Sequence, residues 1–413
     1  MEQFKYLIIG GGVSGTTAAE TIRKGDVSGS IAIVSDEPHR FYSRIMLSKP
    51  NFFLGKIPFE SVWLRAQDWY VKSNVVFMAG RTAIELDPAK KTVTLDNGAV
   101  ACYEKLLLAF GTKPNIWPSD DANKDGVFYL RTLDDARGVM TALKSAKKVA
   151  VVGGGFVGFE MCDLVRMAGL PVTFLIREKY FWDYIWDESS GRMVEAALDR
   201  GGVDLMLGVT VQEILGKGKV SGVRLSDGRT IDCDMLFIGI GVNYPLNWLR
   251  ECGLQIGRGI LANEFLETNL PEVWAAGDVA EYQDVVLNER VIMGNWANAQ
   301  EQGRAAGANM IGAKKPFRLV SFYTTVGFGT TIAFVGDIFP KEGRDIVYRG
   351  SPEINSYARL LVAGNKLIGA TMVNRTVELS SFAKIIDKGL DISDKIGILD
   401  DPNHDLKEIV KDL

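Results

Sequence analysis

Residues 147–178 read KKVAVVGGGFVGFEMCDLVRMAGLPVTFLIRE, and this stretch decides the fold. An apolar run ends in glycines, a helix-like segment follows, and a second β-branched run closes the unit at Val172–Ile176. Gly153, Gly155 and Gly158 fit the pattern G-x-G-x-x-G. In a βαβ unit the first glycine permits a tight turn, the second lets backbone approach a pyrophosphate, and the third lets helix pack close to strand. The stretch therefore predicts a parallel α/β unit that binds a dinucleotide.

The same pattern occurs near the N-terminus. Residues 4–37 contain KYLIIGGGVSG, in which Gly10, Gly12 and Gly15 repeat the spacing, and a second apolar run follows at Ile31–Ser35. In both copies a helix N-terminus would offer free N–H groups and a partial positive charge to phosphates. One copy is weak evidence, because glycine turns also occur in α/β cores that bind no nucleotide. Two copies, each after an apolar run and before a helix, indicate two dinucleotide-binding domains.

The composition limits the class of protein. The chain has 413 residues, of which 47% are hydrophobic and 24% charged. This length fits roughly two to four domains, and these fractions fit sizeable cores. A net charge of −4 gives no basic field that would favour nucleic acid. The apolar runs are shorter than the ~18 residues of a membrane span, and the first leads directly into a glycine turn, so we expect a strand there and no span.

Cysteine and histidine usage argues against several chemistries. Cys102, Cys162, Cys233 and Cys252 are scattered, without C-x-x-C spacing. They suggest no disulfide framework, metal cluster or redox-active pair. Only two histidines are present, which leaves little for a metal site or a catalytic triad. We therefore expect no bound metal and a reducing compartment, the cytoplasm.

Polar residues follow the first βαβ unit. Asp36 comes after its second strand, where an acidic side chain can accept hydrogen bonds from a ribose. Glu37 competes for this role, and the alternative is that both are solvated loop acids. The next loop, FYSRIMLSKP at 41–50, contains Arg44 and Lys49. Two cations there suit a pyrophosphate and a flavin ring, unless they belong to a solvated basic loop.

Later segments also contain predicted strands that end in glycine turns. YEKLLLAFGTKP at 103–114 and DMLFIGIGVNYP at 234–245 each end a buried strand in glycine and proline. VWAAGDVAE at 273–281 puts Asp278 on a tight turn. WANAQEQGRAAGANMIG at 296–312 predicts an amphipathic helix whose small residues suit close packing against a strand or cofactor. The rest of the chain is β-rich and ends in a polar helical segment.

An ordered set of motifs carries a family resemblance: GGGVSG, YSRIMLSKP, YEKLLLAFGTKP, FYLRTLDDA, GGGFVGFE, GIGVNYP, AAGDVAE and WANAQEQG. Together they resemble the FAD-dependent pyridine nucleotide-disulfide oxidoreductase superfamily. More narrowly, they are similar to ferredoxin and rubredoxin reductases, apoptosis-inducing factors and the FAD subunits of NAD(P)H-dependent nitrite reductases. The resemblance covers the whole chain. It implies an α/β fold with an FAD-binding domain at 1–113 and 246–315, a second Rossmann-like domain for NAD(P)H at 114–245, and a C-terminal β-rich α+β interface domain at 316–413.

The resemblance also implies site residues. For FAD they are Gly10, Gly12, Val13, Ser14, Gly15, Asp36, Glu37, Arg44, Lys49, Ala109, Gly111, Arg131, Gly277, Asp278, Trp296 and Ala297. For NAD(P)H they are Gly153, Gly155, Phe156, Val157, Gly158, Glu160, Arg177 and Gly241. Lys49 and Glu160 are the expected catalytic pair, one beside the reduced flavin ring and one beside the nicotinamide.

The chain departs from the family pattern at three places. Ile45–Met46 replaces a pair of prolines, and Phe110 replaces a threonine. Ile176 stands where relatives that use NADH usually carry an acid. Arg177 follows, which favours NADPH, but Glu178 comes next and would suit NADH. The nicotinamide is therefore left open as NAD(P)H.

The implied activity is hydride transfer from NAD(P)H to FAD, followed by electron transfer to a protein carrier such as ferredoxin or rubredoxin. The alternatives are an NAD(P)H oxidase, the FAD subunit of a larger redox complex, and an NAD(P)H-sensing signalling flavoprotein. An acidic carrier would need a basic docking surface, for which KKPFR at 314–318, Arg344 and Arg349 are candidates. We expect a monomer or homodimer, with no nucleic-acid or membrane partner.

Overall fold

The computed structural model describes residues 2–411, and contacts within it divide the chain into two compact units. The first unit contains Met1–Arg44, Glu60–Lys113 and Asn243–Ser321, and the second contains Ile45–Phe59, Pro114–Val242 and Phe322–Leu413. The loop Ile45–Phe59, which we expected in the FAD domain, groups with the second unit. The boundaries of the three expected domains stay a prediction.

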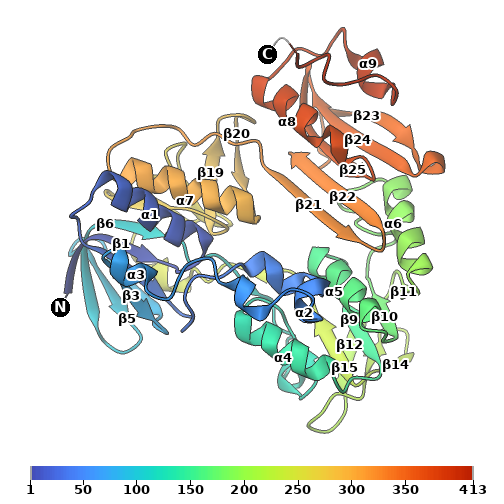
Figure 1. Cartoon of the computed structure of the whole chain (residues 1–413), viewed down its shortest axis with the longest axis horizontal. Helices are drawn as coiled ribbons and strands as arrows, with labels where there is room; N and C mark the ends of the chain where they lie inside the picture. Colours follow the sequence, from blue (N-terminus) through green and yellow to red (C-terminus); the bar gives the residue numbers. More distant parts are fainter. Residues whose placement is uncertain (1, 412–413) are drawn as a thin grey trace. The chain divides into compact units, whose positions relative to one another are not determined.

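A seven-stranded sheet forms the core of the first unit (Figure 1). Its order is β3-β2-β1-β6-β5-β4, and β18 pairs with β6. The strands are β1 (Glu2–Ile9), β2 (Ile31–Ser35), β3 (Val75–Ala79), β4 (Ala83–Asp87), β5 (Thr92–Leu95), β6 (Val100–Leu108) and β18 (Val273–Ala275). The neighbours β3, β2, β1, β6 and β18 run parallel, and continuous apolar runs suit strands that are covered on both faces. The N-terminal apolar run is thus a strand, as predicted.

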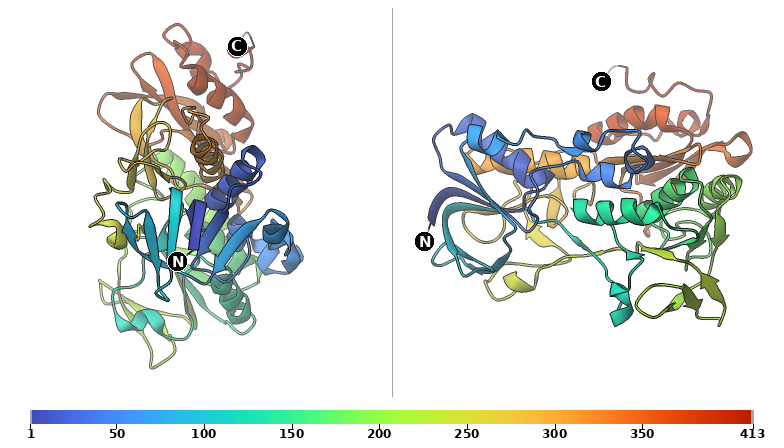
Figure 2. Two further views of the ribbon diagram at one scale, coloured as in Figure 1. Left: turned by 90° about the vertical axis from the view of Figure 1, so that its left-hand side faces the viewer. Right: turned by 60° about the horizontal axis from the view of Figure 1, so that its bottom comes forward.

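Two helices of this unit, α1 (Val13–Gly25) and α7 (Trp296–Met310), lie side by side in Figure 1 and Figure 2. Small residues permit this approach, since a Cβ added at Gly307 would lie 2.7 Å from the carbonyl oxygen of Ala18. The Ala- and Gly-rich helix is closely packed, as predicted, but its close partner here is the helix α1, whereas we expected a strand or a cofactor. The unit also contains α3 (Trp69–Lys72), η4 (Asn247–Leu249), and a small sheet of β17 (Ile260–Ala262), β19 (Ala280–Asp284) and β20 (Glu289–Ile292).

The second unit contains a parallel sheet in the order β11-β10-β9-β15-β8. Its strands are β8 (Val127–Phe128), β9 (Val149–Val152), β10 (Val172–Leu175), β11 (Asp204–Met206) and β15 (Met235–Ile238). The helices are α2 (Pro50–Phe53), α4 (Leu133–Leu143), α5 (Phe156–Met167) and α6 (Glu188–Arg200), and a small sheet holds β12 (Val211–Leu215), β13 (Gly222–Leu225) and β14 (Thr230–Asp232). The predicted βαβ unit is β9-α5-β10, so both Rossmann-like units are confirmed.

The C-terminal part of the second unit is an antiparallel sheet in the order β21-β22-β25-β24-β23. The strands are β21 (Phe322–Gly327), β22 (Thr330–Gly336), β23 (Arg344–Ser351), β24 (Ser356–Ala363) and β25 (Lys366–Val373). Helix α8 (Leu379–Lys388) packs on β22 and β25, and α9 (Ile396–Asp400) lies against β23. The expected α+β C-terminal domain is confirmed.

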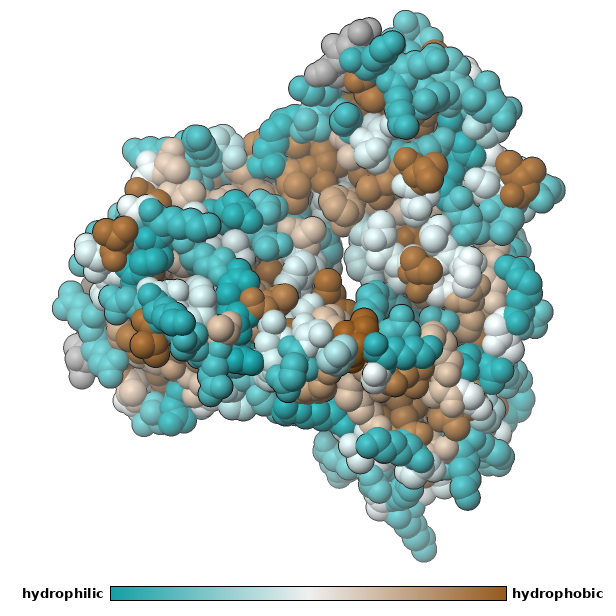
Figure 3. Space-filling view, viewed as in Figure 1, coloured by the Kyte–Doolittle hydropathy of each residue, from teal (hydrophilic) through white to brown (hydrophobic). Residues whose placement is uncertain are grey.

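None of the helices within residues 2–411 combines the length and the apolar character that a membrane span requires. On the face shown in Figure 3, hydrophilic residues predominate and hydrophobic residues are scattered among them. Single exposed apolar residues of this kind are normal on a protein surface and mark no particular binding site.

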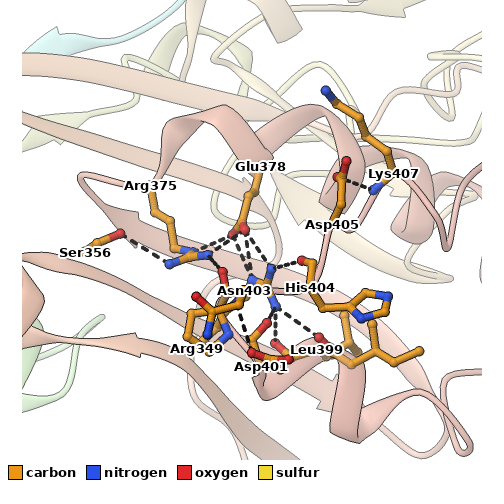
Figure 4. A network of polar contacts seen from close by, with 12 residues as sticks. Arg349, Ser356, Arg375, Glu378, Leu399, Asp401, Asn403, His404, Asp405 and Lys407 are labelled. Carbon is orange, nitrogen blue, oxygen red and sulfur yellow. Dashed lines mark hydrogen bonds and ion pairs between the residues drawn. The ribbon is translucent and has the colours of Figure 1, made fainter.

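A buried cluster of charges ties the C-terminal segment to its sheet (Figure 4). Arg349, on β23, is fully buried, and its guanidinium donates to the Glu378 carboxylate at 2.8–3.0 Å. It also donates to the carbonyl oxygens of Ile398 at 3.0 Å and His404 at 2.6 Å. Arg375 adds hydrogen bonds to Glu378 at 2.6 and 2.7 Å. Two cations and one shared anion therefore hold the segment 398–404 against the sheet.

Arg344 and Arg349 are wrong as candidates for a docking surface. Arg349 has no exposed surface, and the side chain of Arg344 is 8% exposed and donates to Asp337 at 2.7 Å. An arginine whose guanidinium is buried and paired with a carboxylate of the same chain cannot bind an acidic partner protein. The remaining basic candidates, Lys314–Lys315 and Arg318, are exposed.

We predict that Glu378→Gln lowers the free energy of unfolding by about 3–5 kcal/mol, because it leaves two buried guanidinium groups without a counter-charge. Burial opposes ionisation of Glu378, but the hydrogen bonds from Arg375 and Arg349 outweigh it and lower its pKa. A lowered folded pKa means that the stabilisation is present above the unfolded pKa of ~4.3 and is lost as pH falls through the folded value.

Denaturant unfolding of wild type and variant between pH 7 and pH 3 measures this effect. Glu342→Gln is the matched control, because Glu342 is an exposed acid in the same part of the chain. A difference between wild type and Glu378→Gln no larger than the control, or one that grows on acidification, would contradict the assignment.

Candidate functional site

The first glycine loop has a geometry that only glycine permits. Gly10 has φ +123°, and a Cβ there would collide with the backbone of Ala109. A Cβ at Gly15 would collide with the carbonyl oxygen of Gly10, which shows how closely α1 packs on the turn. At Gly12 a Cβ would meet nothing within 4 Å, so this position faces open space. The tight turn at Gly10 and the close helix packing at Gly15 are as predicted, and the approach of a pyrophosphate to Gly12 stays a prediction.

Ser14 tests whether this loop fits a pyrophosphate. The residue is 4% exposed, and its hydroxyl oxygen has no hydrogen-bond partner among the protein atoms of residues 2–411. Buried hydroxyl groups in proteins nearly always have a partner. Ser14 lies in the first turn of α1, where free N–H groups also collect. A phosphate oxygen at this turn would satisfy the hydroxyl, so the residues fit the diphosphate of FAD.

A cavity opens where β1 and β2 end, the usual place for ligands in parallel α/β sheets. Its lining residues are Gly11, Gly12, Val13, Ser35, Glu37, His39, Arg40, Phe41, Tyr42, Arg44 and Trp296. Glu37 accepts hydrogen bonds from the Tyr42 hydroxyl and from Arg44, each at 2.6 Å. Asp36, in contrast, is about half exposed and pairs with Lys113 at 3.6 Å. Of the two acids that the sequence offered for the ribose, the structure places Glu37 in the cavity wall.

Other expected FAD positions gather around the same loop. Trp296, the first residue of α7, stacks on Phe41 with ring centroids 6.0 Å apart, and Ala297 follows it. Gly277 has φ +81°, and a Cβ there would lie 3.1 Å from the side chain of Ser14. Further positions in the first unit are Val13 at the start of α1, Ala109 beside Gly10, Gly111 with φ +70°, and Asp278 next to Gly277. Lys49 and Arg131, also expected to bind FAD, belong to the second unit.

Several contributors to this cavity were missed from the sequence. His39, Arg40 and Phe41 line it from the loop after β2. Gln302, fully buried on α7, accepts the N–H of Gly277 at 2.8 Å and so fixes the turn that carries Asp278. The only available signal was the position of these residues after a strand end or on the small-residue helix.

The second glycine loop, in the other unit, repeats this geometry. Gly153 has φ +100°, and a Cβ there would collide with the backbone of Gly239. A Cβ at Gly158 would collide with the carbonyl oxygen of Gly153, and one at Gly155 would meet nothing within 4 Å. Gly155 is the N-cap of α5 and makes no side-chain cap, so the N–H groups at Phe156 and Val157 stay available to a phosphate.

Matching backbone contacts align the two units residue by residue. Gly10 donates to the carbonyl of Val34 at 2.8 Å, and Gly153 donates to that of Leu175 at 3.0 Å. Residues 35–37 therefore correspond to residues 176–178. Asp36 therefore corresponds to Arg177, and Glu37, the acid in the wall of the first cavity, corresponds to Glu178.

The side chains after β10 have distinct environments. Ile176 is fully buried, and a Cβ at Gly154 would lie 3.1 Å from it. The Arg177 side chain is 81% exposed, and its Nε lies 3.0 Å from Glu178, whose side chain is 15% exposed. Arg177 and Glu178 are therefore the two candidates for contact with the nicotinamide ribose, and the role of each stays a prediction.

Glu160 is a buried carboxylate of the second unit, and three donors meet one of its oxygens. It lies on α5, is 3% exposed, and its Oε1 atom is 2.6 Å from the Lys49 ammonium. The hydroxyl of Thr325 donates to the same oxygen at 2.6 Å, and that of Tyr323 at 3.4 Å. A buried carboxylate requires such partners to remain charged. The pairing of Lys49 with Glu160, expected from the resemblance, is present.

Tyr323 and Phe156 close the other side of this contact. Their ring centroids are 4.1 Å apart, and Phe156 also packs on Trp182 at 4.5 Å. Burial, and then the charge of Glu160, raise the pKa of Tyr323, so its hydroxyl stays a proton donor. Tyr323 and Thr325 were missed from the sequence, because they lie far along the chain from Glu160.

Two expected positions sit apart from these contacts. The backbone N–H of Arg131 donates to Asp135 at 2.9 Å, just before α4, and its role toward FAD stays a prediction. Gly241 has φ +93°, and its carbonyl oxygen accepts the N–H of Asn115 at 3.0 Å. Its role as a wall of the nicotinamide pocket also stays a prediction.

Two of the four cysteines are poorly suited to thiol chemistry. All four are free. Cys162 and Cys233 are buried, and burial raises the pKa of Cys233 to about 12 and that of Cys162 well above its ordinary value. Thiols with raised pKa values are poor nucleophiles at neutral pH.

The chain is similar in sequence to known proteins, and this similarity is consistent with two nucleotide-binding loops. The chain is 29% identical over 407 residues to the nitrite reductase [NAD(P)H] of Bacillus subtilis (strain 168), which covers 97% of this chain and 49% of that protein. The chain therefore spans about half the length of this relative. It is also 29% identical over 406 residues to the biphenyl dioxygenase system ferredoxin–NAD(+) reductase component of Paraburkholderia xenovorans (strain LB400), covering 98% of both.

Among solved structures, the covalent putidaredoxin reductase–putidaredoxin complex matches with a TM-score of 0.92 and 27% identity. The match covers all of this chain and 98% of that one. The family model described as pyridine nucleotide-disulphide oxidoreductase matches residues 4–303. Because that match extends over more than half of the chain and includes both glycine loops, the chain belongs to the pyridine nucleotide-disulphide oxidoreductase family, which uses FAD and NAD(P)H.

Proposed function

We propose that the chain is an NAD(P)H-dependent reductase that passes electrons through FAD to a small protein carrier of the ferredoxin or rubredoxin type. The observation that carries the proposal is the ion pair between the Lys49 ammonium and Glu160, which are 2.6 Å apart. Glu160 lies on α5, the helix that begins within the Gly153–Gly158 loop. Relatives named as ferredoxin reductase components match this chain over nearly their whole length, which supports a carrier of that class.

When bound, FAD takes the hydride that NAD(P)H loses, two electrons with one proton, and gives up electrons one at a time. The chain's own residues bind, orient and balance charge. The Gly10–Gly15 and Gly153–Gly158 loops hold the two diphosphates. The Lys49 ammonium would stabilise negative charge that develops on the ring, as an oriented cation in a partly buried site does. Glu160 holds Lys49 and orients the nicotinamide.

The family name includes a disulfide, but this chain offers no support for disulfide chemistry. Its cysteines are free, and burial raises the pKa values of Cys162 and Cys233. The proposed mechanism therefore uses no side-chain thiol. Four free cysteines also support the cytoplasm as the compartment, since thiols persist where the environment is reducing.

A second candidate function is the FAD subunit, or an FAD-binding part, of a larger reductase. The observation that favours it is the match to about half of the nitrite reductase of Bacillus subtilis. Both functions share the hydride step and differ in whether the acceptor is a diffusing carrier or a fixed partner.

The acceptor side predicts a salt dependence. If an acidic carrier docks on the exposed Lys314–Lys315, reduction of ferredoxin or rubredoxin should weaken steeply with ionic strength, while flavin reduction by NAD(P)H should not. Replacing both lysines by glutamate should raise the KM for the carrier about tenfold, and Lys91→Glu, an exposed lysine between β4 and β5 of the same unit, should leave it unchanged. Equal salt dependence of both half-reactions would contradict a charged, diffusing partner.

The hydride step predicts a specific loss for Lys49→Met. Removing an oriented cation from the site should slow flavin reduction roughly hundredfold. Anaerobic stopped-flow absorbance after mixing with NADPH or NADH measures the rate. Lys56→Met is the control, because Lys56 is exposed in the same loop and should react like wild type. A wild-type rate in Lys49→Met would remove this residue from the mechanism.

The choice between NADPH and NADH depends on Arg177, and we propose NADPH as the preferred cofactor. If its guanidinium binds the ribose phosphate, Arg177→Ala should cost NADPH about 1.5–3 kcal/mol in kcat/KM and leave NADH nearly unchanged. Glu178→Ala tests the opposite assignment, because loss of a carboxylate that accepts from the ribose hydroxyls would lower kcat/KM for NADH instead. An equal loss for both cofactors in Arg177→Ala, or none, would show that Arg177 is only a surface residue.

A further inference from the structure

The edge strand β21 places two hydroxyl groups of the C-terminal sheet on Glu160. Side chains alternate along a strand, so Tyr323 and Thr325 share one face and Thr324 belongs to the other. Thr325 is 2% exposed, whereas Thr324 is exposed. Register with β22 pairs Thr325 with Ile332, which fixes where the buried hydroxyl lies.

The three donors to Glu160 all meet the same carboxylate oxygen. Lys49 and Thr325 each lie 2.6 Å from Oε1, and the Tyr323 hydroxyl lies 3.4 Å from it. Across residues 2–411 the structure shows no hydrogen bond to the other oxygen, Oε2. Since a carboxylate offers about four acceptor positions, the crowded oxygen sets the rotation of the group and Oε2 keeps its acceptor capacity.

Thr325 is the donor best suited to set that rotation. Its hydroxyl makes a short bond to a charged acceptor, which is stronger than a neutral one. A β-branched side chain has few χ1 rotamers, and this one is fixed by burial. The Lys49 side chain is 40% exposed and flexible, so it can follow Glu160 but cannot hold it alone.

We propose that Thr325 is a positioning residue for hydride transfer. It rotates and holds Glu160 so that Oε2 can accept a hydrogen bond from the carboxamide N–H of the nicotinamide, while Oε1 retains Lys49. The C-terminal sheet thereby forms part of the hydride site. This inference rests on the proposed reduction of FAD by NAD(P)H.

The test compares Thr325→Val, which removes the donor at nearly constant shape, with Thr325→Ser, which keeps it. Thr324→Val is the matched control on the other face of the strand. In stopped-flow experiments with the flavin-loaded protein, Thr325→Val should reduce its flavin roughly ten- to hundredfold more slowly at saturating NAD(P)H. Thr325→Ser and Thr324→Val should stay within about twofold of wild type.

Two further readouts separate positioning from a structural role. Dissociation constants for NADP+ and NAD+, titrated on the oxidised protein, should change less than about threefold in Thr325→Val, because phosphate binding lies elsewhere. Against a Glu160→Ala background, Thr325→Val should cause no further loss of flavin-reduction rate, since a residue that acts through Glu160 has nothing left to position.

A wild-type reduction rate in Thr325→Val, or an equal loss in both Glu160 backgrounds, would overturn the inference. A failure of Thr325→Ser to restore the rate would overturn it as well. If wild-type protein itself shows no flavin reduction by either nicotinamide, the proposed function fails, and that result is seen before any variant is compared.

Discussion

The structure depends on the absence of a side chain at two backbone turns. At Gly10 and at Gly153 a single Cβ would collide with the strand-end loop beside it, at Ala109 and at Gly239. Each turn brings a helix N-terminus against the end of a parallel sheet, and each leaves open space before its second glycine, Gly12 or Gly155. The same steric constraint thus shapes two turns in one chain, each with the open space and the helix N-terminus that a diphosphate would need.

Two buried carboxylates show how charge pairing separates structure from function. Glu378 lies between two guanidinium groups that use both of its oxygens, and the cluster holds the C-terminal segment. Glu160 has one ammonium and two hydroxyl donors, all on one oxygen. A carboxylate whose two oxygens both accept hydrogen bonds from cations has a fixed orientation. A carboxylate with an unused oxygen can still accept a hydrogen bond from a ligand. This difference makes Glu160 the candidate for chemistry and Glu378 a structural tie.

Sequence motifs predicted those parts of the fold that are determined by residues close together in the chain. Glycine spacing and apolar runs predicted both βαβ units, because turn geometry and strand burial act over a few residues. Thr325 lies 165 positions from Glu160, and no periodicity connects them. Arg349 was misplaced on the surface, because composition cannot show that a cation has a buried partner. The choice between Asp36 and Glu37 also needed the structure, because the sequence does not show which of two adjacent side chains faces the cavity.

We propose that NAD(P)H reduces a flavin bound to this chain and that the electrons then leave singly to a carrier. The most direct measurement is an anaerobic double-mixing experiment that follows visible flavin absorbance. The protein is first mixed with NADPH or NADH, and then with oxidised ferredoxin or rubredoxin. The account predicts rapid bleaching by at least one nicotinamide, followed by reoxidation of the flavin as the carrier becomes reduced. Flavin that neither nicotinamide bleaches, or that stays reduced in the presence of both carriers, would contradict it.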